Sequence, residues 1–246
     1  MQDSSGSILA DGVDKKRALQ ALALACVLAI PALIWVSHIS PNWMQELRSI
    51  VVAYSTHGSF NDPGPVTSRG PTPGMIIDLQ TIVSIFRDEP GFYNPVTYLL
   101  LAPFILSWMF ITLRSRSSAA NTWFALASIS ALSMLPLYHR QYDAKLLLLT
   151  VPACAILWKE GGPIGWASLL ITSAGVLVTS DIPLAMLELL TRGMHFSTMG
   201  LLEKLKMVFL GRPVPLVLLC LGIFYLFVYM RRNSDVTADS AAPEIL

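Results

Sequence analysis

The segment Tyr138-His139-Arg140-Gln141-Tyr142-Asp143 stands between two strongly apolar stretches, and Lys145 lies just inside the second. The second stretch can cross a membrane only if Asp143 and Lys145 sit at the interface, so this polar turn is expected at the membrane surface. Ionisable groups that close to lipid are costly and point to a function. The segment therefore indicates a helical membrane fold and the first place to look for chemistry.

The composition of the chain agrees with that interpretation. Hydrophobic residues make up 54% of the chain and charged residues only 13%, with a mean hydropathy of +0.58, far from an ordinary soluble domain. The formal net charge is +1, and no long run of one sign predicts nucleic acid as a partner. The cysteines lie in separate apolar runs without a histidine grouping, so they are not expected to form a metal site. No cofactor is predicted, and the use of a divalent metal is left open.

Counting the apolar runs predicts an all-α, polytopic bundle, because a bilayer core takes roughly 20 apolar residues per helix. Six spans are expected, at residues 18–38, 95–113, 122–137, 142–158, 163–186 and 213–230. They form a single membrane domain over 18–232, preceded by a tail at 1–17. The tail at 233–246 is polar and is expected to be disordered.

Basic residues favour placing both termini in the cytoplasm. Positive charges abut the spans in short segments on one side: Lys15, Lys16, Arg17, Arg114, Arg116, Lys159, Arg231 and Arg232. The positive-inside rule applies to such segments more than to long loops. It predicts a multi-pass protein of the inner (cytoplasmic) membrane with the polar turn outside. Lys204, Lys206 and Arg212 count against this orientation.

The external loop at 39–94 is expected to contain two short amphipathic helices, because apolar residues recur at helical spacing from Trp43 to Tyr54 and from Met75 to Phe86. The Gly- and Pro-rich segment 57–74 between them either drapes over a cavity or is a flexible connector. A third amphipathic stretch, around 199–210, precedes the last span on the same side. Together they predict a roofed cavity on the external face.

The residues of the polar turn carry a resemblance to a known family. The string LPLYHRQYDAKLLLL at 135–149, continuing to Val151-Pro152-Ala153-Cys154, resembles the later half of bacterial polytopic glycosyltransferases of the DUF2029 or glycosyltransferase 87 group. In that group a polar and aromatic cluster ending in Asp precedes a leucine-rich helix with an early proline. Segments 78–80 and 92–95 are compatible with the resemblance, which covers roughly residues 43–232.

This resemblance implies a GT-C type enzyme that transfers a sugar from a polyprenyl-phosphate donor to a glycan or lipid acceptor at the external face. Family members are generally longer and carry an acidic catalytic base in an early external loop. None of the acidic residues of that loop matches the family's motif: Glu46, Asp62, Asp78, Asp88 and Glu89. One expectation is therefore a partner subunit that supplies a missing N-terminal half.

Residue types within the polar turn suggest the catalytic groups. Asp143 is expected to act as a base or to orient the acceptor, and His139 to relay a proton near neutral pH. The alternative for Asp143 is a helix cap at the start of the fourth span, which is about equally favoured. For His139 a structural role is the favoured alternative.

Substrate binding is predicted for the cations and aromatic residues of the same turn, together with one acidic residue of the preceding loop. These residues are Arg140, Lys145, Tyr138, Tyr142 and Asp78. The cations would hold a phosphate and the tyrosines would stack on a sugar ring. Alternatively, the cations snorkel to lipid headgroups, the tyrosines belong to an aromatic belt, and Asp78 lies on a solvated helix face.

The competing class is a non-catalytic membrane scaffold or a transporter subunit. Transporters usually place ionisable residues near the middle of the membrane, often in broken helices. The one candidate of this kind in the sequence is Asp181, just before Pro183. Loss of transport on changing Asp181, with no effect of changing Asp143, would favour this alternative.

Overall fold

The computed structural model describes residues 5–59, 61–64, 76–115, 118–137, 139–180 and 200–239. Within these residues all regular elements are helices, as the sequence predicts, and an isolated β-bridge joins Ile76 to Arg140. The chain divides into two compact units, Met1–Ser55 and Thr56–Leu246, each of which is described by itself.

The first unit consists of two helices, α1 (Ser5–Ile39) and α2 (Trp43–Ser55). Their apolar parts meet at a bend of 91°, where the indole N–H of Trp43 donates to Ser37 Oγ at 3.0 Å. The helix α2 confirms the first amphipathic helix predicted for the long loop. The helix α1 begins within the N-terminal tail, earlier than the predicted span.

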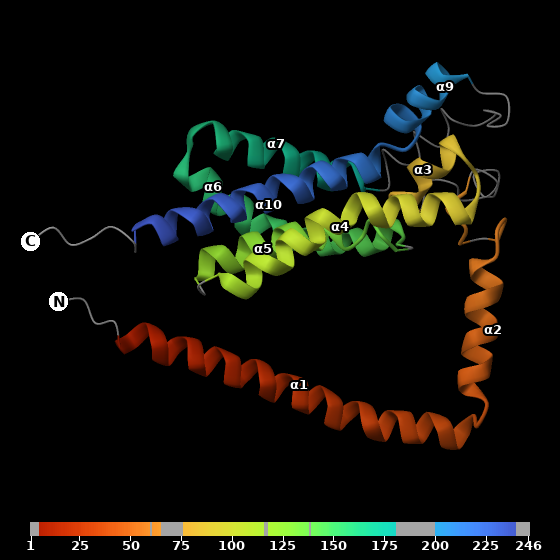
Figure 1. Ribbon diagram of the computed structural model, residues 1–246, viewed down its shortest axis with the longest axis horizontal. Coiled ribbons are helices and arrows are strands. Elements are labelled where there is room, and N and C mark those ends of the chain that lie inside the picture. Colours follow the sequence, from red (N-terminus) through yellow and green to blue (C-terminus); the bar gives the residue numbers. More distant parts are fainter. Residues whose placement is uncertain are drawn as a thin grey trace, which may run out of the picture. The chain divides into compact units, whose positions relative to one another are not determined.

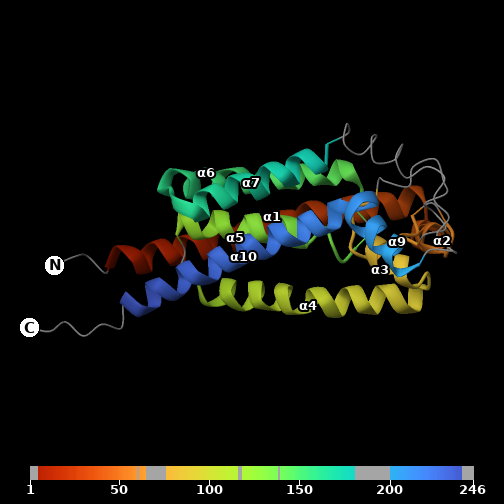
Figure 2. The ribbon, with the colours of Figure 1, turned by 90° about the horizontal axis from the view of Figure 1, so that it is seen from above.

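The second unit is a helical bundle with its two shortest described α-helices, α3 (Gln80–Phe86) and α9 (Leu201–Lys206), at one end (Figure 1). Its elements are α3 (Gln80–Phe86), α4 (Pro90–Arg114), α5 (Ala119–Leu132), the 3₁₀ helix η2 (Gln141–Leu149), α6 (Thr150–Glu160), α7 (Gly162–Val178), α9 (Leu201–Lys206), the π-helix η4 (Met207–Gly211) and α10 (Pro213–Asp239). The helices α5 and α10 pack together in the centre, with α6 and α7 on one side and α4 on the other (Figure 2).

Glycines allow the helices of this bundle to approach closely. A Cβ added at Gly222 in α10 would lie 2.7 Å from the side chain of Leu132 in α5, and one at Gly165 in α7 would lie 2.7 Å from the carbonyl oxygen of Leu157 in α6. In lipid, where apolar burial drives helix association weakly, such close packing of small residues is a main source of stability.

Two helices are long and apolar enough to cross a membrane, Pro90–Arg114 and Pro213–Asn233, and the bent pair of the first unit adds a third if it counts as one span. The helices α5 and α7 are apolar but have only 14 and 17 residues. The described residues therefore support a membrane-embedded helical protein with two or three candidate spans. The count of six spans stays a prediction.

The span predicted at 142–158 is divided between two elements. Its first half belongs to η2, a 3₁₀ helix of 9 residues, and its second half to α6, which has 11 residues. A 3₁₀ helix rises about 2.0 Å per residue, against about 1.5 Å in an α-helix. The leucine-rich segment is thus more extended than one continuous α-helix of the same sequence.

The other two amphipathic stretches are helical in part. The stretch predicted from Met75 to Phe86 becomes α3, which starts only at Gln80 because Asp78 Oδ1 accepts the backbone N–H of Thr81 at 3.0 Å, as a capping side chain does. The stretch around 199–210 forms α9 and η4. The final helix α10 continues to Asp239, within the predicted C-terminal tail.

Backbone hydrogen bonds join the segment before α3 to the polar turn. The N–H of Ile77 donates to the carbonyl of His139 at 3.0 Å, and that of Leu79 to the carbonyl of Leu135 at 3.0 Å. The segment before α3 and the polar turn, far apart in the sequence, therefore meet at the end of the bundle that also holds α9.

Candidate functional site

A histidine–aspartate pair lies at this end of the bundle. His57 Nδ1 is 2.8 Å from Asp62 Oδ2, and the His57 side chain is 40% exposed while that of Asp62 is 1% exposed. Because an ionised carboxylate only accepts hydrogen bonds, the contact favours a proton on Nδ1 and leaves the Nε2 lone pair available. The pair therefore presents a basic nitrogen on a partly exposed ring.

Several donors hold the carboxylate of Asp62 in place. The Tyr93 hydroxyl donates to Oδ1 at 2.6 Å, and the N–H of Gly64 donates to the same oxygen at 3.0 Å. The N–H of Gly58 donates to Oδ2 at 2.5 Å, from a residue with a φ of +82° that favours glycine. Buried carboxylates require such donors, so the loop is built around Asp62.

A second carboxylate, that of Asp88, borders the pair. Its Oδ2 lies 4.0 Å from His57 Nε2, and a Cβ added at Gly64 would collide with its Oδ1. Asp88 therefore lies on the side of the imidazole ring opposite Asp62. Each ring nitrogen of His57 thus faces one carboxylate, Nδ1 that of Asp62 and Nε2 that of Asp88.

Two buried ionisable residues, Asp78 and Arg212, lie close enough to influence each other electrostatically. Asp78 is 0% exposed, and in the described part of the chain its Oδ2 has no hydrogen-bond partner. Arg212 Nη1 donates to the carbonyls of Thr81 at 2.6 Å and Pro63 at 3.3 Å. Arg212 therefore ties η4 to both α3 and the loop that carries Asp62.

Burial perturbs both of these groups. Loss of solvation raises the pKa of Asp78 to about 7, although the Thr81 N–H and the charge of Arg212 lower it. Loss of solvation lowers the pKa of Arg212 to about 10, partly offset by Asp78 and Asp88. A carboxyl that titrates near neutral pH is the kind of group that functional sites use. The structure does not support the alternative of a solvated helix face for Asp78.

The two predicted catalytic residues make local hydrogen bonds in the polar turn. Asp143 Oδ2 accepts the backbone N–H of Arg140 at 3.0 Å, which is the capping contact expected as the alternative to catalysis. His139 Nδ1 lies 2.9 Å from the carbonyl of Leu137, so its Nε2 remains available. The catalytic assignments of both residues stay predictions.

The predicted substrate-binding residues differ in their surroundings. Arg140 is partly buried, Lys145 and Tyr142 are exposed, and Asp78 is buried beneath the loop. Tyr138 lies outside the described residues, as does Asp181, on which the transporter alternative depends.

One hydrogen bond connects the polar turn with the histidine–aspartate pair. Arg140 Nη2 donates to Asn61 Oδ1 at 3.2 Å, and Asn61 directly precedes Asp62. The β-bridge between Arg140 and Ile76 supports the same arrangement from the other side. The guanidinium predicted to hold a phosphate is therefore held next to the loop that carries the basic ring.

Two neighbouring cavities, here together called the groove, lie along the bundle beside η2, α6 and α7. Its first part is a cavity of about 520 Å³ lined by Arg140, Lys145, Tyr142 and Thr179 among others. Its second part is a cavity of about 670 Å³ with mainly apolar walls, including Ala155 and Leu169. Val176 lines both cavities. The groove is thus cationic at one end and apolar at the other, as an amphiphile is.

Sequence reasoning did not single out most of this cluster. His57, Asp62, Tyr93 and Arg212 follow no known motif, and their partners lie up to 149 positions away. The available signal was the density of His, Asp, Gly and Pro at 57–64, where backbone turns bring polar side chains together. Within the described ranges, no group of three His, Cys, Asp or Glu residues is arranged to hold a metal ion.

Comparison of the chain with models of protein families, with curated proteins and with solved structures finds no match. The functional argument therefore rests on the residues of this site and on their geometry.

Proposed function

We propose that the protein is a membrane glycosyltransferase, or a part of one, that takes a sugar from a polyprenyl-phosphate donor to an acceptor at the external face of the inner membrane. The observation that carries the proposal is the hydrogen bond of Arg140 to Asn61, which holds a phosphate-binding cation beside the His57–Asp62 pair. Glycosyl transfer from a lipid phosphate needs a base for the acceptor and cations for the leaving group. This end of the bundle supplies both.

In the proposed reaction His57 is the general base. Its Nε2 takes the proton of the acceptor hydroxyl as the oxygen forms a bond to the sugar's anomeric carbon, and the bond from that carbon to the lipid phosphate breaks. Asp62 fixes the ring through Nδ1 at 2.8 Å and stabilises the imidazolium that forms. Asp88, 4.0 Å from Nε2, stabilises the same cation.

The groove holds the donor in this proposal. Arg140 and Lys145 bind the phosphate at its cationic end, with the guanidinium as the bidentate partner and the ammonium as a point charge. The apolar cavity between α6 and α7 takes the first isoprene units of the lipid. The donor's sugar then points toward the loop that carries His57, and Tyr142 lies on the groove wall to stack against it.

Asp143 and His139 retain roles in the proposal. Asp143 orients Arg140 through the backbone contact at 3.0 Å, so its loss displaces the phosphate-binding cation. His139, with Nε2 available, is the competing candidate for the base. The two histidines lie on different segments, so separate substitutions distinguish them.

The test is sugar transfer from radiolabelled polyprenyl-phosphate sugars in membranes that contain this chain, alone and with the product of the neighbouring gene. Arg140→Ala is expected to reduce transfer by about a hundredfold, because phosphate-binding cations stabilise the leaving group. Asp143→Asn is expected to reduce it less, since an amide oxygen can still accept the Arg140 N–H.

The matched control is Arg48→Ala, which removes an arginine of α2 that does not belong to the polar turn. Transfer by that variant is expected to equal that of the wild type. Transfer only in the presence of the neighbouring product would identify a split enzyme. No transfer from any polyprenyl-phosphate sugar in either membrane would contradict the proposal and favour a scaffold or transporter.

A further inference from the structure

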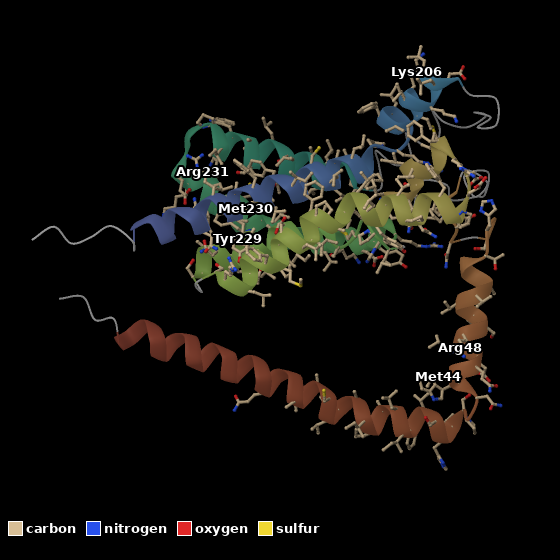
Figure 3. All side chains as sticks on the ribbon, in the orientation of Figure 1. Met44, Arg48, Lys206, Tyr229, Met230 and Arg231 are labelled. Atoms are coloured by element: carbon tan, nitrogen blue, oxygen red, sulfur yellow. The ribbon has the colours of Figure 1, made fainter. Side chains whose placement is uncertain are left out.

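A further cavity lies at the opposite end of the bundle, away from the histidine–aspartate pair. It has a volume of about 600 Å³ and opens between the start of α5, the turn from α6 to α7, and the last part of α10. Figure 3 shows Arg231 on α10 at this end. None of the residues proposed to act in sugar transfer lines this cavity.

The charges around this cavity favour an anion. Arg231, Arg232 and Glu160 line it, and Arg232 forms an ion pair with Glu160 while its guanidinium lies 4.7 Å from the centre of the Phe124 ring. The negative charge of Glu160 is therefore already paired. Arg231 is exposed and has no ion pair within the part of the chain that the structure describes, so one positive charge is left for a ligand.

A buried amide supports the same conclusion independently. Asn121, 8% exposed, lines the cavity from α5. Its backbone N–H donates to Ser118 Oγ at 3.1 Å, but the described residues provide no hydrogen bond for its side-chain amide. The amide atoms are not fully enclosed by protein, so a ligand or water in the cavity can complete their hydrogen bonds. The amide N–H is a suitable donor to a phosphate or a glycerol oxygen.

The position of the cavity identifies the kind of anion. Arg231 and Arg232 are among the last residues of the candidate span Pro213–Asn233, where the headgroups of a bilayer lie. Apolar side chains continue the cavity wall along the bundle, with Phe227 59% and Ile164 39% exposed. Cations above an apolar wall fit a phosphate with its acyl chains, and basic pockets between membrane helices bind anionic lipids.

We infer that this cavity binds one anionic phospholipid, with its phosphate on Arg231 and the Asn121 amide and an acyl chain along Phe227 and Ile164. The site is separate from the proposed sugar-transfer site, and its lipid is a bound structural ligand. Because residues of α5, α6, α7 and α10 all line the cavity, the lipid would contact four helices of the bundle at once.

The experiment uses the full chain purified in a neutral maltoside detergent. Thermal unfolding followed by tryptophan fluorescence is measured with added dioleoylphosphatidylglycerol, dioleoylphosphatidylcholine or inorganic phosphate, and bound lipid is counted by native mass spectrometry. The phosphatidylglycerol is expected to raise Tm by about 3 °C and to remain bound as a single copy, since a ligand of the folded state stabilises it by mass action. The other two additives are expected to leave Tm unchanged.

Arg231→Gln tests the site without disturbing the Arg232–Glu160 ion pair. It is expected to weaken phosphatidylglycerol binding by about tenfold, the loss of one charge-assisted contact. The control is Arg114→Gln, which removes a cation at the end of α4 that does not line the cavity; this variant is expected to bind as the wild type does.

Three results would overturn the inference. Equal stabilisation by phosphatidylcholine would show that the cavity does not select an anion. Equal stabilisation by inorganic phosphate would show a site for a soluble anion in place of a lipid. Unchanged phosphatidylglycerol binding by Arg231→Gln, with the variant unfolding at the wild-type temperature, would place any bound lipid elsewhere.

Discussion

Asp62 is the residue on which the proposed chemistry most depends, because it is buried and holds His57 through Nδ1 at 2.8 Å. Asp62→Asn can present an N–H to the ring, which favours the tautomer with the proton on Nε2 and removes the base. Sugar transfer is expected to fall by about 10² to 10⁴-fold, the usual contribution of a general base. Initial rates measured beside the Tm of each variant would separate this effect from misfolding.

Tyr93→Phe is the matched milder change. It removes one of the donors to Asp62, the hydroxyl at 2.6 Å, but leaves the His57 contact intact. We expect a loss of transfer of about tenfold or less, near the value of one hydrogen bond. If Tyr93→Phe reduced transfer as much as Asp62→Asn does, the loss of transfer would come from a disturbed loop structure and not from the tautomer of His57.

Asp78 makes the stability of the protein depend on pH. Burial raises its pKa to about 7 in the folded state from the ordinary aspartate value of 3.8, so between these values the folded protein holds a proton that the unfolded chain releases. The contribution of Asp78 to the free energy of unfolding is therefore most favourable below about pH 4 and decreases as the pH rises toward 7. Asp78→Asn should flatten this dependence between pH 5 and 8, as measured by Tm in detergent.

Other groups also titrate, so the comparison of the two proteins carries the test. Arg212, with a pKa lowered to about 10, stays charged throughout this range. If the wild type and Asp78→Asn lose Tm in parallel from pH 5 to 8, Asp78 does not hold a proton in the folded protein. The variant's amide can keep the contact with the Thr81 N–H.

Residues could be predicted from the sequence where a local rule applies to them. Asp143 stands at the start of a helix, and its capping contact with the Arg140 N–H follows from that position. His57 and Asp62 obey no such rule, because turns in a Gly- and Pro-rich loop bring them together. Asp78 lies at the edge of an amphipathic stretch, but its burial depends on tertiary packing, which brings Arg212, 134 residues later in the sequence, to the carbonyl of Thr81.

At the scale of elements, the pair α6 and α7 depends on a glycine. Gly165→Ala would place a Cβ 2.7 Å from the backbone oxygen of Leu157, an atom that cannot rotate away. We expect a loss of about 1 to 3 kcal/mol, as for other overpacked sites, measured as the free energy of unfolding in mixed detergents. Gly91→Ala in α4 is the control, since nothing lies within 4 Å of the added atom.

An equal effect of the two glycine substitutions would contradict the close packing of α6 and α7. A Gly165→Ala protein with the wild-type free energy of unfolding would also count against the proposed groove. The groove runs between these helices, and its apolar wall includes Ala155 and Leu169.

The existence of each helix was predictable, whereas its length and type were not. Apolar periodicity predicts α2 and the helix that ends at Phe86, and both are present. Hydropathy does not distinguish a 3₁₀ helix from an α-helix, because both bury the same side chains, so it predicted one span where η2 and α6 follow each other. Whether the short helices α5 and α7 cross the membrane depends on the thickness of the lipid bilayer around them.

At the scale of the whole molecule, the orientation predicts which residues are accessible from each side of the membrane. Single cysteines are introduced at Thr56, Ser118 and Asn233 in a protein whose native cysteines, Cys26, Cys154 and Cys220, are replaced by alanine. In intact cells an impermeant maleimide is expected to label position 56 only. In inverted vesicles it is expected to label positions 118 and 233.

Opposite labelling would invert the orientation and place the histidine–aspartate pair in the cytoplasm, where the proposed donor's sugar does not lie. Labelling of positions 118 and 233 from different sides would contradict the arrangement of α5 and α10, whose ends border one cavity. The density of basic residues beside the spans predicts labelling of position 56 from outside and of positions 118 and 233 from inside. It does not predict how the helices pack.

The role of His57 as the general base is tested by sugar transfer with the purified chain in liposomes. The variants compared with the wild type are His57→Gln, His139→Gln and His38→Gln. We predict that His57→Gln lowers the transfer rate by about a hundredfold or more with an unchanged Tm, while His38→Gln transfers at the wild-type rate. If His57→Gln transfers at the wild-type rate and His139→Gln is inactive, the base lies in the polar turn and the role of the His57–Asp62 pair is wrong.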